Sequence, residues 1–102
     1  MFNSEKLFSS FVFCRSSVNF SKKKDTFLVL SQDRKHILEL KDVSFSIWQN
    51  LEKPISFSAL IKKLQKEYDV AEEVLEKDLK SWLKEALKEK IIKKVKLNNL
   101  NH

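Results

Sequence analysis

Glycine is absent from this chain of 102 residues, although it makes up about 7% of average proteins. The absence excludes the glycine-rich phosphate loops of nucleotide-binding proteins, because such loops need residues without a side chain close to the phosphates. Turns must therefore be built from asparagine, aspartate, serine and lysine instead of glycine.

Cysteine and long apolar runs are scarce as well. The single cysteine, Cys14, excludes an internal disulfide and is typical of a reducing cytoplasm. No apolar run approaches the roughly 18 residues that a membrane span requires. The apolar patch at residues 7–14 is interrupted by serines, and it lacks the basic start and the small-residue cleavage site of a signal peptide. We therefore predict a cytoplasmic protein with no membrane partner.

Candidate catalytic and metal-binding residues are equally sparse. Cys14, His36 and His102 lie far apart in the sequence and share no metal-ligand spacing. We interpret His36 as a surface strand residue and Cys14 as a small apolar filler. The carboxylates mostly alternate with lysines on expected helix faces, as in the pair Glu73–Lys77. The sequence thus predicts a protein that is not an enzyme and holds no cofactor or metal.

The chain has enough residues for one domain, and 42% of them are hydrophobic, which suffices for a core. The net charge is +6. Residues 1–55 contain nine lysines and arginines against six acids, and residues 56–102 contain eleven against eight, so each half carries +3. Nucleic-acid-binding proteins usually concentrate their positive charge on one face, so this even spread disfavours that function.

The local patterns predict an α+β fold in which a three-stranded antiparallel sheet precedes three helices. Alternating and β-branched residues indicate strands at 17–21, 26–30 and 36–41, separated by short polar turns. Apolar residues spaced three to four apart indicate helices at 42–51, 56–68 and 71–90, and residues 91–97 alternate weakly, as in a short final strand. Residues 1–15 fit either a helix turn or a strand, and we expect a flexible start leading into an extended segment.

The stretch from His36 to Leu51 joins the sheet to the helices without a loop. Asp42 is expected to cap the first helix, and Ser56 the second. The apolar face of the second helix should be buried, as should a stripe on the third helix that includes Trp82. Trp82 and the tryptophan of the first helix are interpreted as core residues rather than as ligand-stacking residues.

Without a catalytic constellation, a binding function remains. Two surfaces are candidates: the pair of helices at residues 56–90, and an exposed edge of the sheet, which is a template for adding another strand.

At residues 26–92 the sequence resembles the PqqD-type proteins, also called RiPP recognition elements. The resemblance lies in an ordered set of short motifs: Phe27-Leu28-Val29-Leu30, Ile37-Leu38-Glu39-Leu40, Ile47-Trp48 with Leu51, Pro54-Ile55-Ser56-Phe57, Leu64 with Tyr68-Asp69-Val70, Val74, Asp78, Leu83, Leu87 and Ile91-Ile92. The chain departs from the family in having Lys41 where asparagine is usual, Glu52-Lys53 in place of an Asp-Gly-like turn, and Lys90 in place of a glycine.

The resemblance implies a fold like a winged helix-turn-helix, with three antiparallel strands followed by a three-helix bundle. It implies the domain division 1–16 for a partly flexible extension, 17–97 for the peptide-binding domain and 98–102 for a tail. It also implies a function: such domains bind the leader segment of a ribosomally synthesised precursor peptide and deliver it to a modifying enzyme, which can be a radical SAM enzyme, a protease or a cyclase.

In this family the leader adds as a strand to the edge of the third strand, beside the third helix. Carried over by position, the peptide-binding edge is His36, Ile37, Leu38, Glu39, Leu40 and Lys41, and the helix wall is Lys77, Asp78, Ser81 and Lys84. Leaders are often acidic, so lysines along the groove would steer them electrostatically.

Two alternatives stay open at this point. The first is a winged helix-turn-helix that binds DNA; against it, residues 71–90 contain five lysines and six acids, and a recognition helix that faces phosphates should not be net negative. The second is an assembly module whose sheet edge pairs with itself, so that the protein is a monomer or a weak homodimer.

Overall fold

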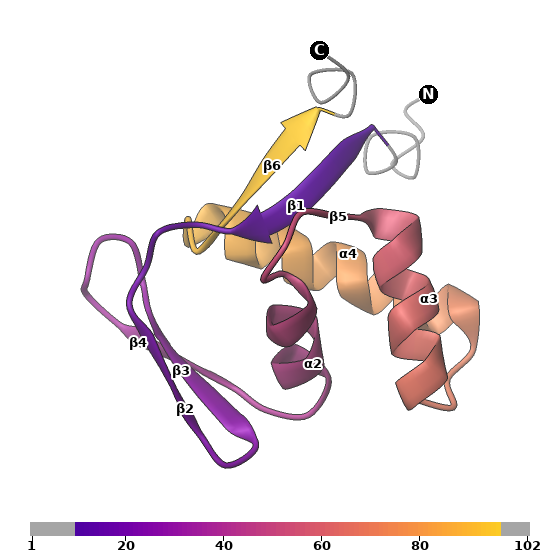
Figure 1. Cartoon of the computed structure of the whole chain (residues 1–102), viewed down its shortest axis with the longest axis horizontal. Coiled ribbons are helices and arrows are strands. Elements are labelled where there is room, and N and C mark those ends of the chain that lie inside the picture. Colours follow the sequence, from indigo (N-terminus) through magenta and orange to yellow (C-terminus); the bar gives the residue numbers. More distant parts are fainter. Residues whose placement is uncertain (1–9, 97–102) are drawn as a thin grey trace.

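The computed structural model describes residues 10–96 of the chain (Figure 1). The elements are, in chain order, β1 (Phe11–Arg15), β2 (Phe20–Lys23), β3 (Thr26–Leu30), β4 (Ile37–Leu40), α2 (Val43–Asn50), β5 (Ile55–Ser56), α3 (Phe57–Glu67), α4 (Glu72–Lys88) and β6 (Ile92–Lys96). The predicted α+β class, with a three-stranded antiparallel sheet before the helices, is confirmed.

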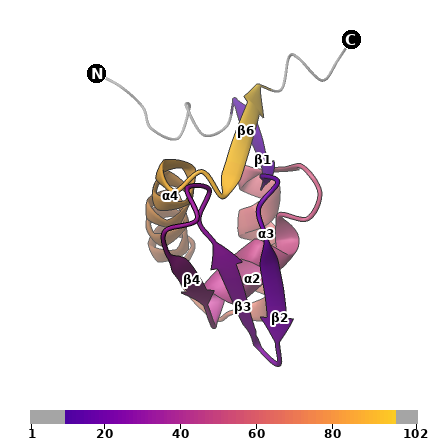
Figure 2. The ribbon, with the colours of Figure 1, turned by 90° about the vertical axis from the view of Figure 1, so that its left-hand side faces the viewer.

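The strands β2, β3 and β4 form the predicted antiparallel sheet, in that order (Figure 2). Its first strand begins at Phe20, three residues later than the sequence predicts, because the chain turns between Ser16 and Asn19. The turn between β2 and β3 has only two residues, and Lys24 adopts a positive φ of 56° there, as a glycine would in most hairpins.

A second sheet, which the sequence did not predict, joins the two ends of the described chain. Its order is β5-β1-β6, and all neighbours are antiparallel. The final strand expected at residues 91–97 exists as β6, and its partner is β1. The segment assigned to an N-terminal extension therefore supplies the central strand of this sheet, while residues 1–9 and the tail 98–102 lie outside the described residues. Figure 1 shows this β1–β6 ribbon beside the helices.

The core lies between the two sheets and the three described helices. On α3 all four residues of the expected stripe are buried: Phe57, Leu60, Ile61 and Leu64. On α4 the buried residues are Leu75, Leu79, Leu83 and Ala86, whereas Trp82 and Leu87 are only partly buried. Trp82 packs against the core, as the sequence analysis expects, but it is only partly buried because its ring borders a groove described below.

The predicted N-cap hydrogen bond is present at α3 and absent at α2. The Ser56 side chain accepts a hydrogen bond from the Ala59 N–H at 3.2 Å, as expected of an N-cap. Asp42 precedes α2 as predicted, but its side chain makes no capping hydrogen bond, because its backbone has a φ of 54° rather than the extended conformation of most N-caps.

Candidate functional site

The two sheets have three exposed edge strands of four or five residues, and these strands differ in whether they contain lysine. Edge strand β2 reads FSKK and edge strand β6 reads IKKVK, so lysines occupy both. The third edge strand, β4, reads ILEL and contains no lysine. Charged residues, above all lysine, are a common device that prevents another strand from pairing with an edge. Of the described edge strands, β4 is therefore the best template for an added strand.

The backbone of β4 has alternate groups free to pair with an added strand. The Ser31 N–H donates to the His36 carbonyl at 2.9 Å, which makes this pair a hydrogen-bonded one. Hydrogen-bonded and non-hydrogen-bonded pairs alternate along an antiparallel ladder. With the register Val29↔Leu38, the backbone of Leu38 therefore faces β3, and the backbone N–H and C=O groups of Glu39 point away from the sheet.

The side chains of β4 divide between the two faces of the sheet. Leu40 lies opposite Phe27 on the inner face and is buried. Leu38 is on the same face and partly buried. Ile37 and Glu39 occupy the outer face, where Ile37 is 64% exposed. Strand β4 thus presents a free backbone edge between an apolar inner face and a wet outer face.

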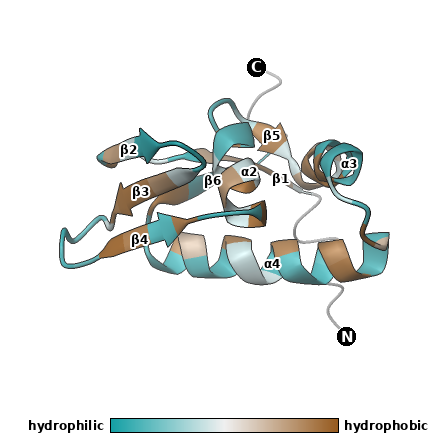
Figure 3. Ribbon diagram, turned by 90° about the horizontal axis from the view of Figure 1, so that it is seen from below, coloured by the Kyte–Doolittle hydropathy of each residue, from teal (hydrophilic) through white to brown (hydrophobic). Residues whose placement is uncertain are grey.

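An apolar groove lies between β4 and α4, which run side by side (Figures 2 and 3). Its volume is about 160 Å³. The residues that line it are Leu38, Leu40 and Ile91, together with Trp82, Glu85, Ala86 and Glu89 of α4 and its C-terminal cap. In Figure 3, strand β4 is coloured mostly as hydrophobic and lies beside the C-terminal part of α4.

Two contacts fix the shape of the groove. The Trp82 Nε1–H donates to the Ser44 hydroxyl at 3.1 Å, which ties the indole ring to α2 and sets its orientation. At the other end His36 Nδ1 lies 3.6 Å from the Glu89 carboxylate, which brings the residue before β4 close to the C-terminal cap of α4. The α4 side of the groove is therefore in contact with α2 at one end and with the start of β4 at the other. Such contacts between elements preorganise a binding site.

A hydrogen-bonded turn sets where β4 begins. The Ser31 hydroxyl donates to the Asp33 carboxylate at 2.6 Å and accepts from the His36 N–H at 3.2 Å. The Lys35 N–H also donates to Asp33 at 3.0 Å. The pKa of the Asp33 carboxyl is lowered, first by the Ser31 hydrogen bond and then by the Lys35 N–H and the neighbouring positive charges.

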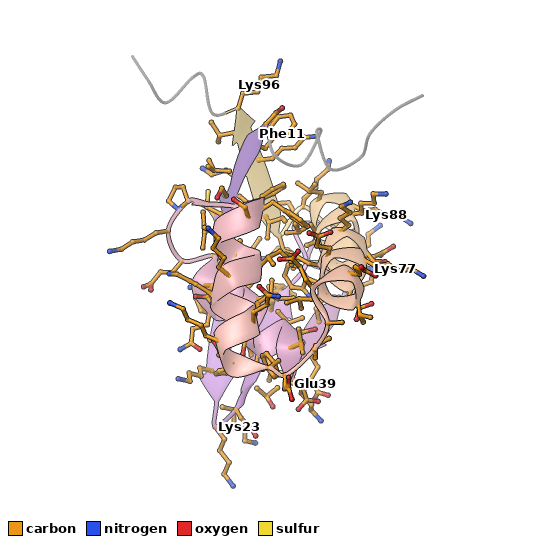
Figure 4. The ribbon with its side chains drawn as sticks, turned by 90° about the vertical axis from the view of Figure 1, so that its right-hand side faces the viewer. Phe11, Lys23, Glu39, Lys77, Lys88 and Lys96 are labelled. Atoms are coloured by element: carbon orange, nitrogen blue, oxygen red, sulfur yellow. The ribbon has the colours of Figure 1, made fainter. Side chains whose placement is uncertain are left out.

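The structure places the six predicted strand residues, His36, Ile37, Leu38, Glu39, Leu40 and Lys41, along one edge, although the strand itself spans only Ile37–Leu40. The four predicted helix residues, Lys77, Asp78, Ser81 and Lys84, are all exposed and share a hollow that residues of α4 line alone, separate from the β4–α4 groove. Figure 4 shows Lys77 and Lys88 directed outward from the helix.

The sequence reasoning missed the helix residues that line the groove. Trp82, Glu85 and Glu89 are spaced three and four apart, so they share a face of α4. That spacing was visible in the sequence. However, the face it defines lies next to the buried stripe of Leu75, Leu79 and Leu83, and residue spacing alone does not separate two neighbouring faces of a helix. Only the position of β4 shows which of them borders an open edge.

The described residues offer little else for chemistry. Within residues 10–96 no group of three or more His, Cys, Asp or Glu side chains is placed to hold a metal ion. Cys14 is buried, and His102 lies outside the described residues. None of the helices in the described part of the chain has the length and apolar character needed to cross a membrane.

Comparisons with known proteins agree with the sequence resemblance. The pattern of the family described as coenzyme PQQ synthesis protein D (PqqD) matches residues 27–92, about two thirds of the chain. The matched range includes all of β3 but its first residue, together with β4 and the three described helices, and hence both sides of the groove. No curated protein and no solved structure matched the chain. Because the match covers more than half of its residues, this chain belongs to the PqqD family, whose members are accessory proteins in the biosynthesis of PQQ and other ribosomally derived peptide products.

Proposed function

We propose that this protein binds the leader segment of a ribosomally synthesised precursor peptide as an additional strand on β4 and delivers the precursor to a modifying enzyme. That enzyme would be a radical SAM enzyme, a protease or a cyclase. The observation that carries the proposal is the lysine-free edge of β4 beside an apolar groove. Backbone hydrogen bonds to the edge give affinity for any extended segment, and the groove selects its side chains.

The expected affinity follows from the physics of strand addition. A free leader is disordered, so ordering it on β4 costs free energy and weakens the complex. We expect a Kd near or somewhat below 1 µM, on the order of −8 to −10 kcal/mol. A complex of this strength can be released to an enzyme without a large barrier, as an accessory protein requires.

The exposed α4 residues extend the proposed site along the helix. Asp78 and Ser81 lie within one turn of Trp82, at the end of the groove where Leu40 also lies. A leader that continues past Trp82 toward the N-terminus of α4 would meet these two residues, with Lys77 and Lys84 on the same hollow.

The two alternatives are less well supported. Self-pairing of β4 would use the same free backbone edge and would compete with the leader. Binding experiments must therefore distinguish a dimer formed through β4 from a complex with the leader. DNA binding is disfavoured because α4 itself carries five acids and four lysines. The lysines that could form a basic patch are divided between α3 (Lys62, Lys63, Lys66) and β6 (Lys93, Lys94, Lys96).

A proline substitution at Glu39 tests strand addition. Its N–H points away from β3, so Glu39→Pro removes a donor from the free edge and leaves the ladder to β3 intact. We expect binding of a fluorescein-labelled synthetic leader, taken from a precursor gene adjacent to the gene of this protein, to weaken by about tenfold or more. Fluorescence anisotropy measures the change.

Lys22→Pro is the matched control. The Leu30 N–H donates to the Asn19 carbonyl, so by the same alternation the Lys22 N–H points away from β3 at the opposite edge of the same sheet. This variant should bind the leader like the natural protein. Equal weakening in both variants, or none in either, would contradict strand addition on β4. Sedimentation of the free protein shows whether Glu39→Pro also removes a dimer, which would indicate self-pairing at this edge.

A further inference from the structure

The rim of the β4–α4 groove is acidic. Glu85 and Glu89 border it, and of the residues that line the groove in the described range none is a lysine or an arginine. Within residues 10–96 no cation forms an ion pair with Glu85, and His36 is the side chain that approaches Glu89. Lys77, Lys84 and Lys88 of α4 are exposed, and Figure 4 shows Lys77 and Lys88 directed outward, while the Lys80 Nζ lies 6.0 Å from the centre of the Phe57 ring on α3. Lysines that would steer an acidic leader therefore do not line this groove.

The positions of these two carboxylates are unfavourable for the helix itself. Glu85 and Glu89 are four residues apart, and like charges at this spacing destabilise a helix. Both also lie in the last turn or at the cap of α4, where the helix dipole disfavours negative charge. A local arrangement that opposes folding and borders an open binding edge indicates that a ligand supplies the missing positive charge.

We propose, on the basis of the function proposed above, that the bound segment contains one apolar residue and two basic residues at every second position along the strand. The apolar residue comes at one end of this set, and the peptide can run in either direction along β4. The floor of the groove at Trp82 and Leu40 takes the apolar side chain. The basic side chains face Glu85 and Glu89 and lay their aliphatic stems over Ala86 and Ile91.

The spacing of the groove fits an extended peptide. Four residues along α4 separate Glu85 from Glu89 by about 6 Å. Two residues along a strand span about 6.7 Å, and alternate side chains of a strand point to the same side. A peptide strand on β4 therefore presents every second side chain to α4 at nearly the interval of the two carboxylates. The volume of about 160 Å³ is sufficient for one apolar side chain, since cavities of about 150 Å³ hold benzene.

Four labelled nonapeptides test the proposal. The first has the sequence Thr-Val-Leu-Thr-Lys-Thr-Lys-Val-Thr. The second and third replace both lysines with glutamate or with glutamine, and the fourth moves the lysines by one position so that they point to the opposite side of the strand. We expect the lysine peptide to bind about fivefold more tightly than the glutamine peptide, because two exposed ion pairs contribute about this much. The glutamate peptide should bind more weakly than either. The fourth should lose this gain while keeping its charge.

The double variant Glu85→Gln/Glu89→Gln should remove the preference for lysine. The control Glu72→Gln, exposed in the first turn of α4 and outside both the groove and the hollow, should keep it. If all four peptides bind equally and Glu39→Pro abolishes their binding, the basic preference is wrong and strand addition on β4 stands. If Glu39→Pro has no effect on any of them, or none binds at concentrations up to about 1 mM, both proposals are overturned. Circular dichroism of each variant confirms that it is folded.

Discussion

Individual residues do in this chain what glycine does in most others. Lys24, Arg34, Asp42 and Lys90 have positive φ values between 54° and 64°. A residue with a side chain destabilises this left-handed conformation by about 1–2 kcal/mol. Lys90 follows the cap of α4, where the Ile91 N–H donates to the Ala86 carbonyl and the Lys90 N–H to the Leu87 carbonyl. This is the hydrogen-bond pattern of a Schellman motif, whose left-handed position usually belongs to glycine.

Lys90→Gly should therefore stabilise the protein. We expect the free energy of unfolding to rise by about 0.5–1 kcal/mol, which is the relief of left-handed strain less the larger backbone entropy of glycine in the unfolded chain. Urea denaturation followed by circular dichroism measures the change. The control Lys88→Gly, inside the last turn of α4, should instead lower the free energy of unfolding by about 1 kcal/mol. A loss of stability in Lys90→Gly would contradict the strain argument.

At the scale of elements, strand β4 depends on the turn that precedes it. The Ser31 hydroxyl connects the Asp33 carboxylate to the His36 N–H, so the start of the proposed binding edge is held by a carboxylate whose pKa is lowered. A group with a lower pKa in the folded state stabilises the fold above its ordinary pKa, and this stabilisation is lost as the pH falls through the folded value.

The variant Asp33→Asn should show this dependence. At pH 7 the natural protein should be more stable than the variant, and the difference should shrink as the pH falls below the ordinary aspartate value of 3.8. Urea unfolding at a series of pH values provides the measurement. Asp25→Asn, in the hairpin between β2 and β3, is a suitable control because the described residues give Asp25 no side-chain hydrogen bond. A constant difference from pH 7 to pH 2 would show that the Asp33 carboxylate does not contribute.

At the scale of the whole molecule, β1 connects the two sheets and the helices. Its Phe13 side chain is 1% exposed and belongs to the core. Arg15 donates from Nε to the Trp48 carbonyl at 3.0 Å, and its guanidinium lies 4.9 Å from the Phe20 ring centre and 5.0 Å from that of Trp48. Burial lowers the pKa of Arg15. The central strand of one sheet is thereby attached to α2 and to the edge of the other sheet.

Phe13→Ala should accordingly destabilise the whole domain by about 3–5 kcal/mol, a large fraction of the stability of a domain of this size. Chemical denaturation should give a single transition at a lower midpoint by both tryptophan fluorescence and circular dichroism. Phe20→Ala is the matched control, and it should cost less because Phe20 is 43% exposed. If Phe13→Ala were as stable as the control, β1 would be an appendage, as the predicted domain division at residue 16 supposes.

The elements and faces that local patterns determine were predictable. The stripe of α3, the Ser56 cap and the meander of β2, β3 and β4 depend on residues close in sequence, because helix and strand periodicity report burial directly. The strand β1 was ambiguous because its residues fit two periods, and its partner β6 lies about 80 residues away. No local pattern specifies a pairing over that separation.

The fold class and the family were predictable from the sequence, because the ordered hydrophobic motifs are properties of short segments. The edge at β4 was expected only from the family resemblance, and its lack of lysine gains meaning only once the sheet order places β4 at an edge. Only the tertiary structure decided that Trp82, Glu85 and Glu89 face this edge and that Lys77 and Lys84 do not. The physical reason is that a helix presents several faces with equally regular spacing. Which of them borders a groove depends on how α4 packs against β4, and that packing is set by the whole core.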